Sequence, residues 1–213
     1  VKAAFAHTAS ENQGHSNAEY DKLFEESGVL REKTWQEFLD TSLALGNCPP
    51  LRGDNVVIIT NGGGAGLLAA DHFERLGMPL KELKDISPDL RENIRNYMPA
   101  FGSPLNPVDI SGTATSDMYG GALKTAYRDE HVDGILISVC PTAVTDVEAI
   151  TETVINIHRQ YKNLGKPFIM ECQGGNECRE AIMKLRDKGI PAYSTPEQAV
   201  NAMVALRRYS HIM

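Results

Sequence analysis

The stretch Asn55-Val-Val-Ile-Ile-Thr60-Asn61-Gly-Gly-Gly-Ala-Gly66 decides the fold expected for this chain. Its apolar run, 56–59, has no polar interruption, which is typical of a strand buried on both faces. The glycines that follow end the strand, and a helical spacing of apolar residues begins at 66 and continues to 76. A strand, a glycine turn and a helix form the first half of a βαβ unit, so a parallel sheet covered by helices is expected.

The same alternation of strand and helix continues to the end of the chain. We expect strands at 56–60, 134–139, 168–172 and 192–193, with a short second strand near 80–83 completing five. Helices are expected at 66–76, 88–97, 117–129, 146–164, 177–188 and 196–208. Right-handed crossovers between these strands predict an α/β fold with a flavodoxin-like, doubly wound parallel sheet. Ligands of such sheets bind at the carboxyl ends of the strands.

The first 54 residues have a different organisation. Residues 1–16 have the small, polar and glycine-rich composition of a loop, and helices are expected at 17–27 and 34–45, with a short strand at 29–33 between them. The segment 48–54, Cys-Pro-Pro-Leu-Arg-Gly-Asp, interrupts every periodicity. It is therefore the predicted linker between residues 1–47 and a domain at 55–213. Because the chain opens at Val1 in a loop, we expect a fragment or a processed subunit.

Charge and cysteine content narrow the classes of partner. A formal net charge of −7 argues against nucleic acid and anionic membranes, because both need clustered lysine and arginine. No apolar run approaches the roughly 20 residues that span a bilayer, and the start of the chain is unlike a signal peptide, so a cytoplasmic location is expected. The four cysteines are scattered, without a C-x-x-C pair or a histidine at zinc-finger spacing, and we expect no metal site.

The glycine turn is a candidate phosphate site. Backbone N–H groups at the start of a helix face outward and favour an anion, and the expected contributors are Asn61, Gly62, Gly63, Gly64 and Gly66. A tight turn without a ligand is the alternative, since glycine serves turns as often as sites. The Lys-Ser/Thr of a P-loop is missing. Residues 64–69 match the dinucleotide fingerprint G-x-G-x-x-A, with Glu82 near the expected spacing, but a lone match is weak evidence.

Three further turns fall at the same expected edge of the sheet. Asn106 and Asp109, in Asn-Pro-Val-Asp, suit a polar site rim or a structural Asx-turn. The turn before the longest helix offers N–H groups for phosphate, with Thr145 as the expected cap and Asp146 in the first turn; its candidate residues are Thr142, Val144, Thr145 and Asp146. Gly174 and Gly175 would permit close approach of a ligand. Each is an ordinary turn alone, and their recurrence at one edge favours a site.

His7 is the candidate nucleophile among the six histidines. It stands in a small-residue loop, Phe-Ala-His-Thr-Ala-Ser, where an imidazole is free to move, as nucleophilic catalysis requires. Most loop histidines do nothing chemical, so the composition by itself leaves a surface role open.

Two separated sets of motifs resemble the ADP-forming acetate–CoA ligases, relatives of succinyl-CoA synthetase. The first set is Ala6-His7-Thr8, Ala18-Glu-Tyr-Asp21, Gly28-Val-Leu-Arg31 and Trp35-Gln-Glu-Phe38. The second is Asn61 to Gly66, Leu68-Ala-Ala-Asp71, Asn106-Pro-Val-Asp109, Val144-Thr-Asp146 and Gly174-Gly175. Ala6 stands where serine is usual in that family, and Ala9-Ser-Glu11 stands where Gly-Ala-Leu is usual.

This resemblance implies both an organisation and a reaction. Residues 1–47 would be the carboxy-terminal piece of a second flavodoxin-like domain, in which His7 is phosphorylated. Acid, CoA and ATP would give acyl-CoA, ADP and phosphate by way of acyl phosphate and phosphohistidine. This chain alone is expected to bind no cofactor, whereas the complete enzyme would use ATP or ADP, Mg²⁺ and coenzyme A.

The resemblance also implies partners and an alternative. A Rossmann-like CoA-binding domain and an ATP-grasp domain would lie on another chain or segment, in an oligomer. The alternative is a non-catalytic flavodoxin-like binding module, as in a protein acyltransferase with borrowed ligase domains.

Overall fold

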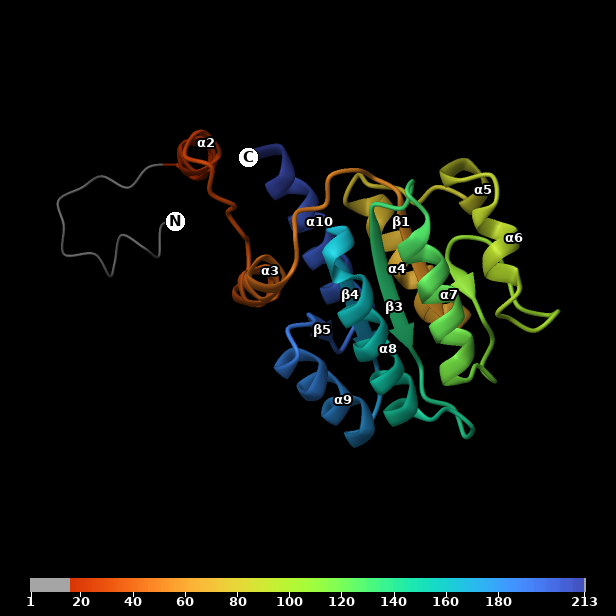
Figure 1. Cartoon of the computed structure of the whole chain (residues 1–213). Coiled ribbons are helices and arrows are strands. Elements are labelled where there is room, and N and C mark those ends of the chain that lie inside the picture. Colours follow the sequence, from red (N-terminus) through yellow and green to blue (C-terminus); the bar gives the residue numbers. More distant parts are fainter. Residues whose placement is uncertain (1–15, 213) are drawn as a thin grey trace.

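A five-stranded parallel sheet forms the centre of the molecule (Figure 1). The computed structural model describes residues 16–212. The strands lie in the order β2-β1-β3-β4-β5. Their bounds are β1 (Val56–Thr60), β2 (Val108–Asp109), β3 (Gly134–Val139), β4 (Phe168–Cys172) and β5 (Ala192–Tyr193). This order is that of a flavodoxin-like doubly wound sheet, so the predicted fold class is confirmed.

Helices cover both faces of the sheet, as Figure 1 shows with α7 and α8 in front and α4 and α10 behind. The bounds are α2 (Asn17–Glu26), α3 (Trp35–Asn47), α4 (Gly63–Arg75), α5 (Leu83–Ile86), α6 (Leu90–Arg95), α7 (Ser116–Arg128), α8 (Val147–Tyr161), α9 (Asn176–Asp187) and α10 (Pro196–Ile212), with a 3-10 turn at Lys162–Leu164. Within residues 16–212, no helix has the length and apolarity needed to cross a membrane.

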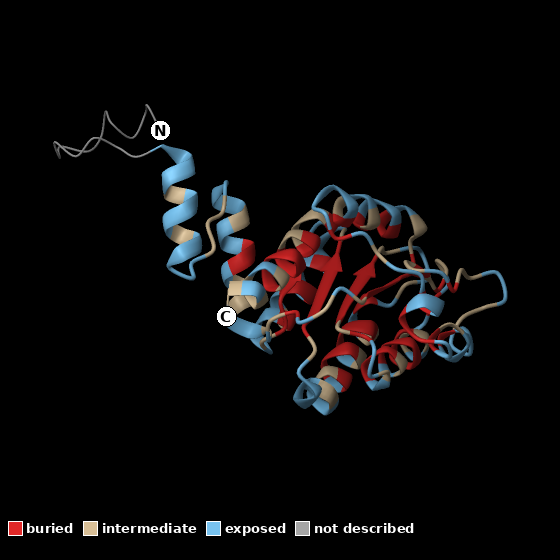
Figure 2. Cartoon of the chain, turned by 90° about the horizontal axis from the view of Figure 1, so that it is seen from above, coloured by how far each residue is buried: buried red, intermediate tan, exposed pale blue. Residues whose placement is uncertain are grey.

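Alternate residues of the central strands enter two separate cores. Val57 and Ile59 pack with α7, α8 and α9, whereas Val56 and Ile58 pack with α4 and α10. All five residues of β1 are buried, as are all six of β3 and all five of β4 (Figure 2). Burial on both faces explains why these strands read as unbroken apolar runs in the sequence.

The second strand differs from the prediction. Residues 80–83 form no strand, and Leu83 instead begins α5. The edge strand is β2, only two residues long. Beside it, the Asn106 side chain accepts a hydrogen bond from Ile58 N (3.1 Å) and donates one to Val56 O (2.8 Å). The Asn106 amide thus makes backbone hydrogen bonds to β1 that a longer edge strand would otherwise make.

Two boundaries before and after β1 also differ. The strand expected at 29–33 does not form, because this segment packs beside helices rather than a sheet edge: Arg31 binds Asn17 and Asp21 of α2, and Arg208 donates to Arg31 O. Helix α4 begins at Gly63, three residues before the predicted start, with Gly62 as its N-cap. Glycine weakens a helix but does not prevent the first turn.

The predicted linker lies against the sheet domain. Leu51 is fully buried and donates its N–H to Leu206 O of α10 (3.2 Å). Helix α3 packs on α10, and its Ala44 belongs to the same core as Val56. The Tyr193 hydroxyl donates to Asp40 O (2.7 Å). The domain boundary at 48–54 remains a prediction, and residues on both sides of it share one core.

Candidate functional site

The candidate site lies at the carboxyl edge of the sheet, between β1 and β3. The chain leaves β1 toward β2 on one side and later places β3 on the other, so the strand order reverses at this point. Doubly wound sheets bind ligands in the crevice at such a switch point. Two segments meet there, 61–66 after β1 and 140–146 after β3, and we call them the switch-point turns.

Asn61 connects the two switch-point turns. Its amide oxygen accepts hydrogen bonds from Cys140 N (2.8 Å) and from the Tyr119 hydroxyl (3.0 Å). Its amide nitrogen donates to Cys140 O (2.9 Å) and lies 3.4 Å from the Thr145 hydroxyl. The residue is 3% exposed. Its side chain therefore holds the turns together and is not available to a ligand.

The glycines at the start of α4 lie close to neighbouring segments. A Cβ on Gly62 would lie 2.6 Å from the Cys140 sulfur, and one on Gly66 would lie 3.0 Å from Pro107. A Cβ on Gly64 would meet nothing within 4 Å. Close packing therefore explains Gly62 and Gly66, whereas Gly64 faces open space.

The first turn of α4 supplies free backbone donors. The first N–H groups of a helix have no partner inside it, and those of Gly63 and Gly64 donate to no acceptor among the described residues. Gly64 is exposed and Gly63 is half-buried. These two N–H groups are the best placed on the described chain to receive an anion at the switch point.

The loop after β2 brings a carboxylate to the same edge. Asp109 Oδ1 accepts from Ser111 N (2.8 Å), which forms the Asx-turn considered from the sequence. Ser111 has a positive φ of 78°. The other oxygen would lie 2.8 Å from a Cβ on Gly63, so the carboxylate sits against the start of α4. Asn106 points elsewhere, to the β1 backbone, and is not near the carboxyl edge.

Hydroxyl groups organise the turn after β3. Thr142 Oγ1 donates to Gly112 O (3.0 Å) and lies 2.9 Å from the Thr145 hydroxyl. The N–H of Thr142 donates to Thr145 Oγ1 (3.0 Å), and that of Val144 to Thr142 Oγ1 (3.3 Å). These donors are thus occupied, although the Val144 side chain is 68% exposed.

Asp146, and not Thr145, is the N-cap of α8. Its carboxylate accepts from Ala149 N (2.9 Å) and so satisfies one of the free donors of the helix. A surface hollow beside it is lined by further carboxylates, those of Glu148, Glu177 and Glu180. The several carboxylates around this helix start oppose phosphate more strongly than the single Asp109 carboxylate does at the glycine turn, which favours the glycine turn of the two predicted sites.

The turn after β4 completes the edge. Gly174 and Gly175 are both exposed. A Cβ on Gly174 would lie 3.0 Å from the Cys178 sulfur and 3.1 Å from Pro141, so this turn touches the turn after β3. The structure therefore brings Asn61 to Gly66, Asp109, Thr142 to Asp146 and Gly174 to one edge. His7 lies outside the described residues.

Two residues near this edge were not predicted from the sequence. The Cys140 sulfur accepts from the Gln173 amide (3.2 Å), and burial raises the pKa of its thiol. Glu171, in β4, is completely buried; its Oε2 accepts from the Ser138 hydroxyl (2.6 Å), while its Oε1 has no partner among residues 16–212. A glutamate inside an apolar strand was the available signal, since buried carboxylates are rare.

The dinucleotide interpretation does not suit this geometry. Its glycines should form the turn before a helix, but Gly64 and Gly66 lie within α4. Glu82 is exposed and pairs with Lys84 (2.9 Å) instead of facing the switch point.

Comparison with known proteins shows the family of the sheet domain. The Ligase-CoA domain family matches residues 56–212. This chain belongs to that family. The Ligase-CoA domain begins at β1 and ends with α10, so it contains the sheet and both switch-point turns.

Relatives of this Ligase-CoA chain are ADP-forming ligases. It is 42% identical to the alpha subunit of acetate–CoA ligase (ADP-forming) I of Pyrococcus furiosus, over 99% of this chain and 44% of the relative. It is 29% identical to 4-hydroxybutyrate–CoA ligase (ADP-forming) of Nitrosopumilus maritimus, over 99% of this chain and 29% of the relative. The resemblance seen in the sequence motifs is confirmed.

A solved structure is similar along the whole chain. Dinucleotide-forming acetyl-coenzyme A synthetase 1 of Candidatus Korarchaeum cryptofilum, in complex with phosphate and ADP, matches with a TM-score of 0.91 and 34% identity, over 99% of this chain and 44% of that one. This chain therefore spans less than half the length of the relatives that it matches.

Proposed function

We propose that this chain is the carboxy-terminal part of an ADP-forming acid–CoA ligase, with His7 as the carrier of the phosphoryl group. The observation that supports this most strongly is the 42% identity to an acetate–CoA ligase alpha subunit, because it extends over 99% of the chain and thus includes both sets of motifs. A Ligase-CoA domain alone would match only residues 56–212.

The proposed chemistry transfers one phosphoryl group twice. An imidazole nitrogen of His7 forms a bond to the phosphorus of acyl phosphate, while the bond from phosphorus to the acyl oxygen breaks and releases the acid. ADP then takes the phosphoryl group from the imidazole to give ATP. In the reverse direction, ATP phosphorylates His7 and leaves as ADP, and the acid takes the phosphoryl group from the imidazole to give acyl phosphate. The CoA thiol then attacks the acyl carbon and releases inorganic phosphate, which gives acyl-CoA. Such transfers depend chiefly on positioning and on charge stabilisation.

The switch-point turns would supply part of that stabilisation. We assign the phosphate to the N–H groups of Gly63 and Gly64, at the start of α4, with the Thr142 to Asp146 turn and Gly174 forming the walls. A Rossmann-like domain for CoA and an ATP-grasp domain for ATP and Mg²⁺ would come from another segment or chain. Since the chain spans 44% of the Pyrococcus subunit, additional segments have room to supply such sites.

Phosphorylation of His7 tests the proposal. The chain, combined with its missing domains, is given Mg²⁺ and ATP labelled in the γ-phosphate. We expect label that is lost in acid and retained in alkali, as a phosphoramidate requires. His7→Asn should abolish both label and turnover, whereas His15→Asn, the same change eight positions along the chain, should retain both. The chain alone should form no ADP from acid, CoA and ATP.

Turnover that survives His7→Asn would exclude the phosphohistidine mechanism. It would make the non-catalytic binding module the better interpretation of the fold.

A further inference from the structure

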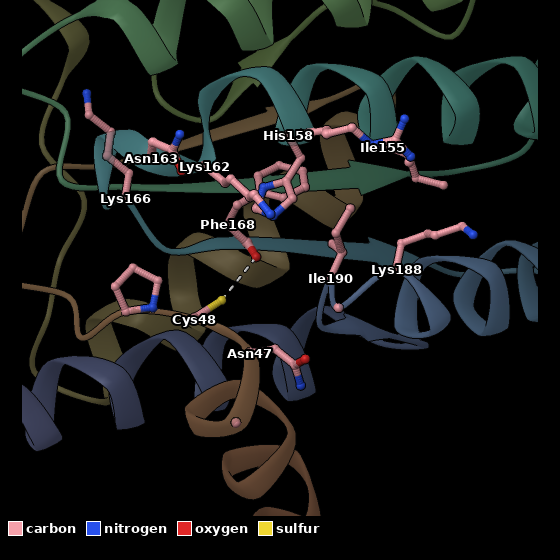
Figure 3. A pocket seen from close by; sticks show the side chains of 14 residues that line it. Asn47, Cys48, Ile155, His158, Lys162, Asn163, Lys166, Phe168, Lys188 and Ile190 are labelled. Atoms are coloured by element: carbon pink, nitrogen blue, oxygen red, sulfur yellow. Dashed lines mark hydrogen bonds between the residues drawn. The ribbon is translucent and has the colours of Figure 1, made fainter.

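A cavity of about 580 Å³ lies at the opposite edge of the sheet, where β4 begins (Figure 3). We call it the amino-edge cavity. Its walls come from three places. The end of α3 contributes Asn47 and Cys48, and the turn before β5 contributes residues 188–190. The end of α8 and the following turn contribute His158, Arg159, Lys162 and Asn163. Its size is that of a pocket for a small organic ligand.

Positive charge surrounds this cavity. Arg159, Lys162 and Lys188 line it, and no aspartate or glutamate does. In the described part of the chain, none of these three cations has a carboxylate within ion-pair distance, although the net charge of the chain is −7. Lys166 also lines the cavity, but its ammonium donates to Ala126 O and Asp129 O and points away from it (Figure 3).

A neutral histidine, His158, also lines the amino-edge cavity. The Nδ1 of His158 is bonded to the Tyr127 hydroxyl (2.9 Å), and the ring stacks on Phe168 with centroids 5.4 Å apart. Burial, followed by the charge of Lys162, lowers the pKa of His158 to about 4, so the ring is neutral at pH 7. The Nε2 of this ring has no partner among residues 16–212 and is the ring nitrogen left for a ligand; it carries the proton when the Tyr127 hydroxyl donates to Nδ1.

We propose that the amino-edge cavity binds a small phosphorylated molecule, which is attracted by the positive charges of Arg159, Lys162 and Lys188 on its lining. Three cations on a lining that holds no carboxylate suit an anion that carries more than one charge, although Glu152, outside the lining, interacts with Lys188 and Arg159. Arginine and lysine are the usual phosphate partners. The cavity is larger than inorganic phosphate requires. Ile155, Ile190 and Pro49 supply an apolar wall for the organic part of such a ligand.

Helix ends give these lysines a second, purely structural interpretation. Lys162 and Lys188 are the C-cap residues of α8 and α9, where positive charge offsets the helix dipole. That role changes only the stability of the helices. Binding of a phosphorylated ligand is the property that separates the two interpretations.

Titration of the isotopically labelled chain by NMR tests the proposal. ADP should shift the backbone amide signals of Asn163 and Gly189 at the amino-edge cavity. Gly63 and Ala143 report on the switch-point turns, so phosphate binding under the proposed function is read separately. Inorganic phosphate in a parallel titration shows whether the phosphate group alone suffices, and adenosine, which lacks it, should cause no shift at either edge.

Two variants make the test specific. Lys162→Gln with Lys188→Gln should raise the Kd for ADP at the amino-edge cavity about tenfold or more. Lys124→Gln, the same substitution made once at an exposed position of α7 outside the cavity, should change it less than about twofold. No shift of Asn163 or Gly189 at millimolar ADP or phosphate would overturn the proposal, as would equal weakening by Lys124→Gln or an adenosine shift of the same size.

Discussion

Asn61 shows at the scale of one residue how the site is built. The sequence placed it among the phosphate-binding candidates, but its amide makes bonds to Cys140 and Tyr119 and is buried. An unsatisfied buried amide costs about 1–3 kcal/mol, so these bonds are strongly maintained. Asn61 therefore sets the distance between the two switch-point turns, and the ligand donors that we propose are the backbone N–H groups two and three residues later.

Glu171 makes the stability of the chain depend on pH. Burial raises the pKa of this carboxyl from 4.5 to about 7, against the opposing effect of the bond from Ser138. Between these pH values the folded chain holds a proton that the unfolded chain has released. The contribution of Glu171 to the free energy of unfolding therefore falls as pH rises through this window, by about 3 kcal/mol in all.

Glu171→Gln should remove that dependence. Glutamine cannot ionise, and its amide oxygen can still accept from Ser138. We expect the variant to exceed the parent in free energy of unfolding at pH 8 by about 2–3 kcal/mol, and to match it near pH 5. Urea unfolding at both pH values measures this, with Glu180→Gln, an exposed carboxylate of α9, as the control. Identical pH profiles for parent and Glu171→Gln would refute the prediction.

At the scale of one element, the start of α8 shows how a cap and a ligand compete for the same donors. Asp146 was predicted in the first turn, yet it is the N-cap and already supplies an anion to the helix. Because the Asp146 carboxylate occupies the N-cap position instead of the first turn, it takes the N–H group that a phosphate at the start of α8 would need.

The α8 cap gives a direct prediction. Asp146→Ala removes the acceptor for Ala149 N and should lower the free energy of unfolding by about 1 kcal/mol. Asp146→Asn keeps an oxygen acceptor and should retain most of that stability. Urea unfolding of the three proteins measures the difference. Equal losses in both variants would mean that the charge, and not the hydrogen bond, is what the helix requires.

The elements also show what the sequence could and could not reveal. Strands β1, β3, β4 and β5 were predicted to the residue, because strands buried on both faces leave apolar runs that glycines and prolines end. Strand β2 was missed, since a strand of two residues shows no periodicity. Beside it, the Asn106 side chain supplies a hydrogen bond to the backbone of β1 that a longer strand would make. The turns at the carboxyl edge were predicted from chain order alone. The contacts of Cys140 and Glu171 join distant segments, and no local pattern encodes them.

At the scale of the whole molecule, the first two helices differ in how firmly they are attached. Helix α2 has no buried residue and appears almost entirely exposed in Figure 2. Helix α3 is fixed to α10 by apolar packing and by a polar contact, since the Gln198 amide lies 3.2 Å from Asp40 Oδ1. Arg208 of α10 also donates to Glu32, in the segment before α3 (3.2 Å). Exposed aromatic residues on the other side of α3, Trp35 and Phe38, stack with centroids 5.3 Å apart.

Truncation at two places tests whether α3 belongs energetically to the sheet domain. A chain of residues 30–213 loses α2 and keeps α3, so its free energy of unfolding should stay within about 0.5 kcal/mol of the parent. A chain of residues 48–213 loses α3 as well, which exposes the apolar face of α10 and removes the acceptor of the Tyr193 hydroxyl. Several kcal/mol should be lost, because both an apolar contact and a buried hydrogen bond disappear. Urea unfolding compares the three chains, and the shorter one should bind more of a hydrophobic dye. If 48–213 instead unfolds at the same urea concentration as the parent, α3 adds nothing to the sheet domain, and the boundary predicted at 48–54 is also the energetic one.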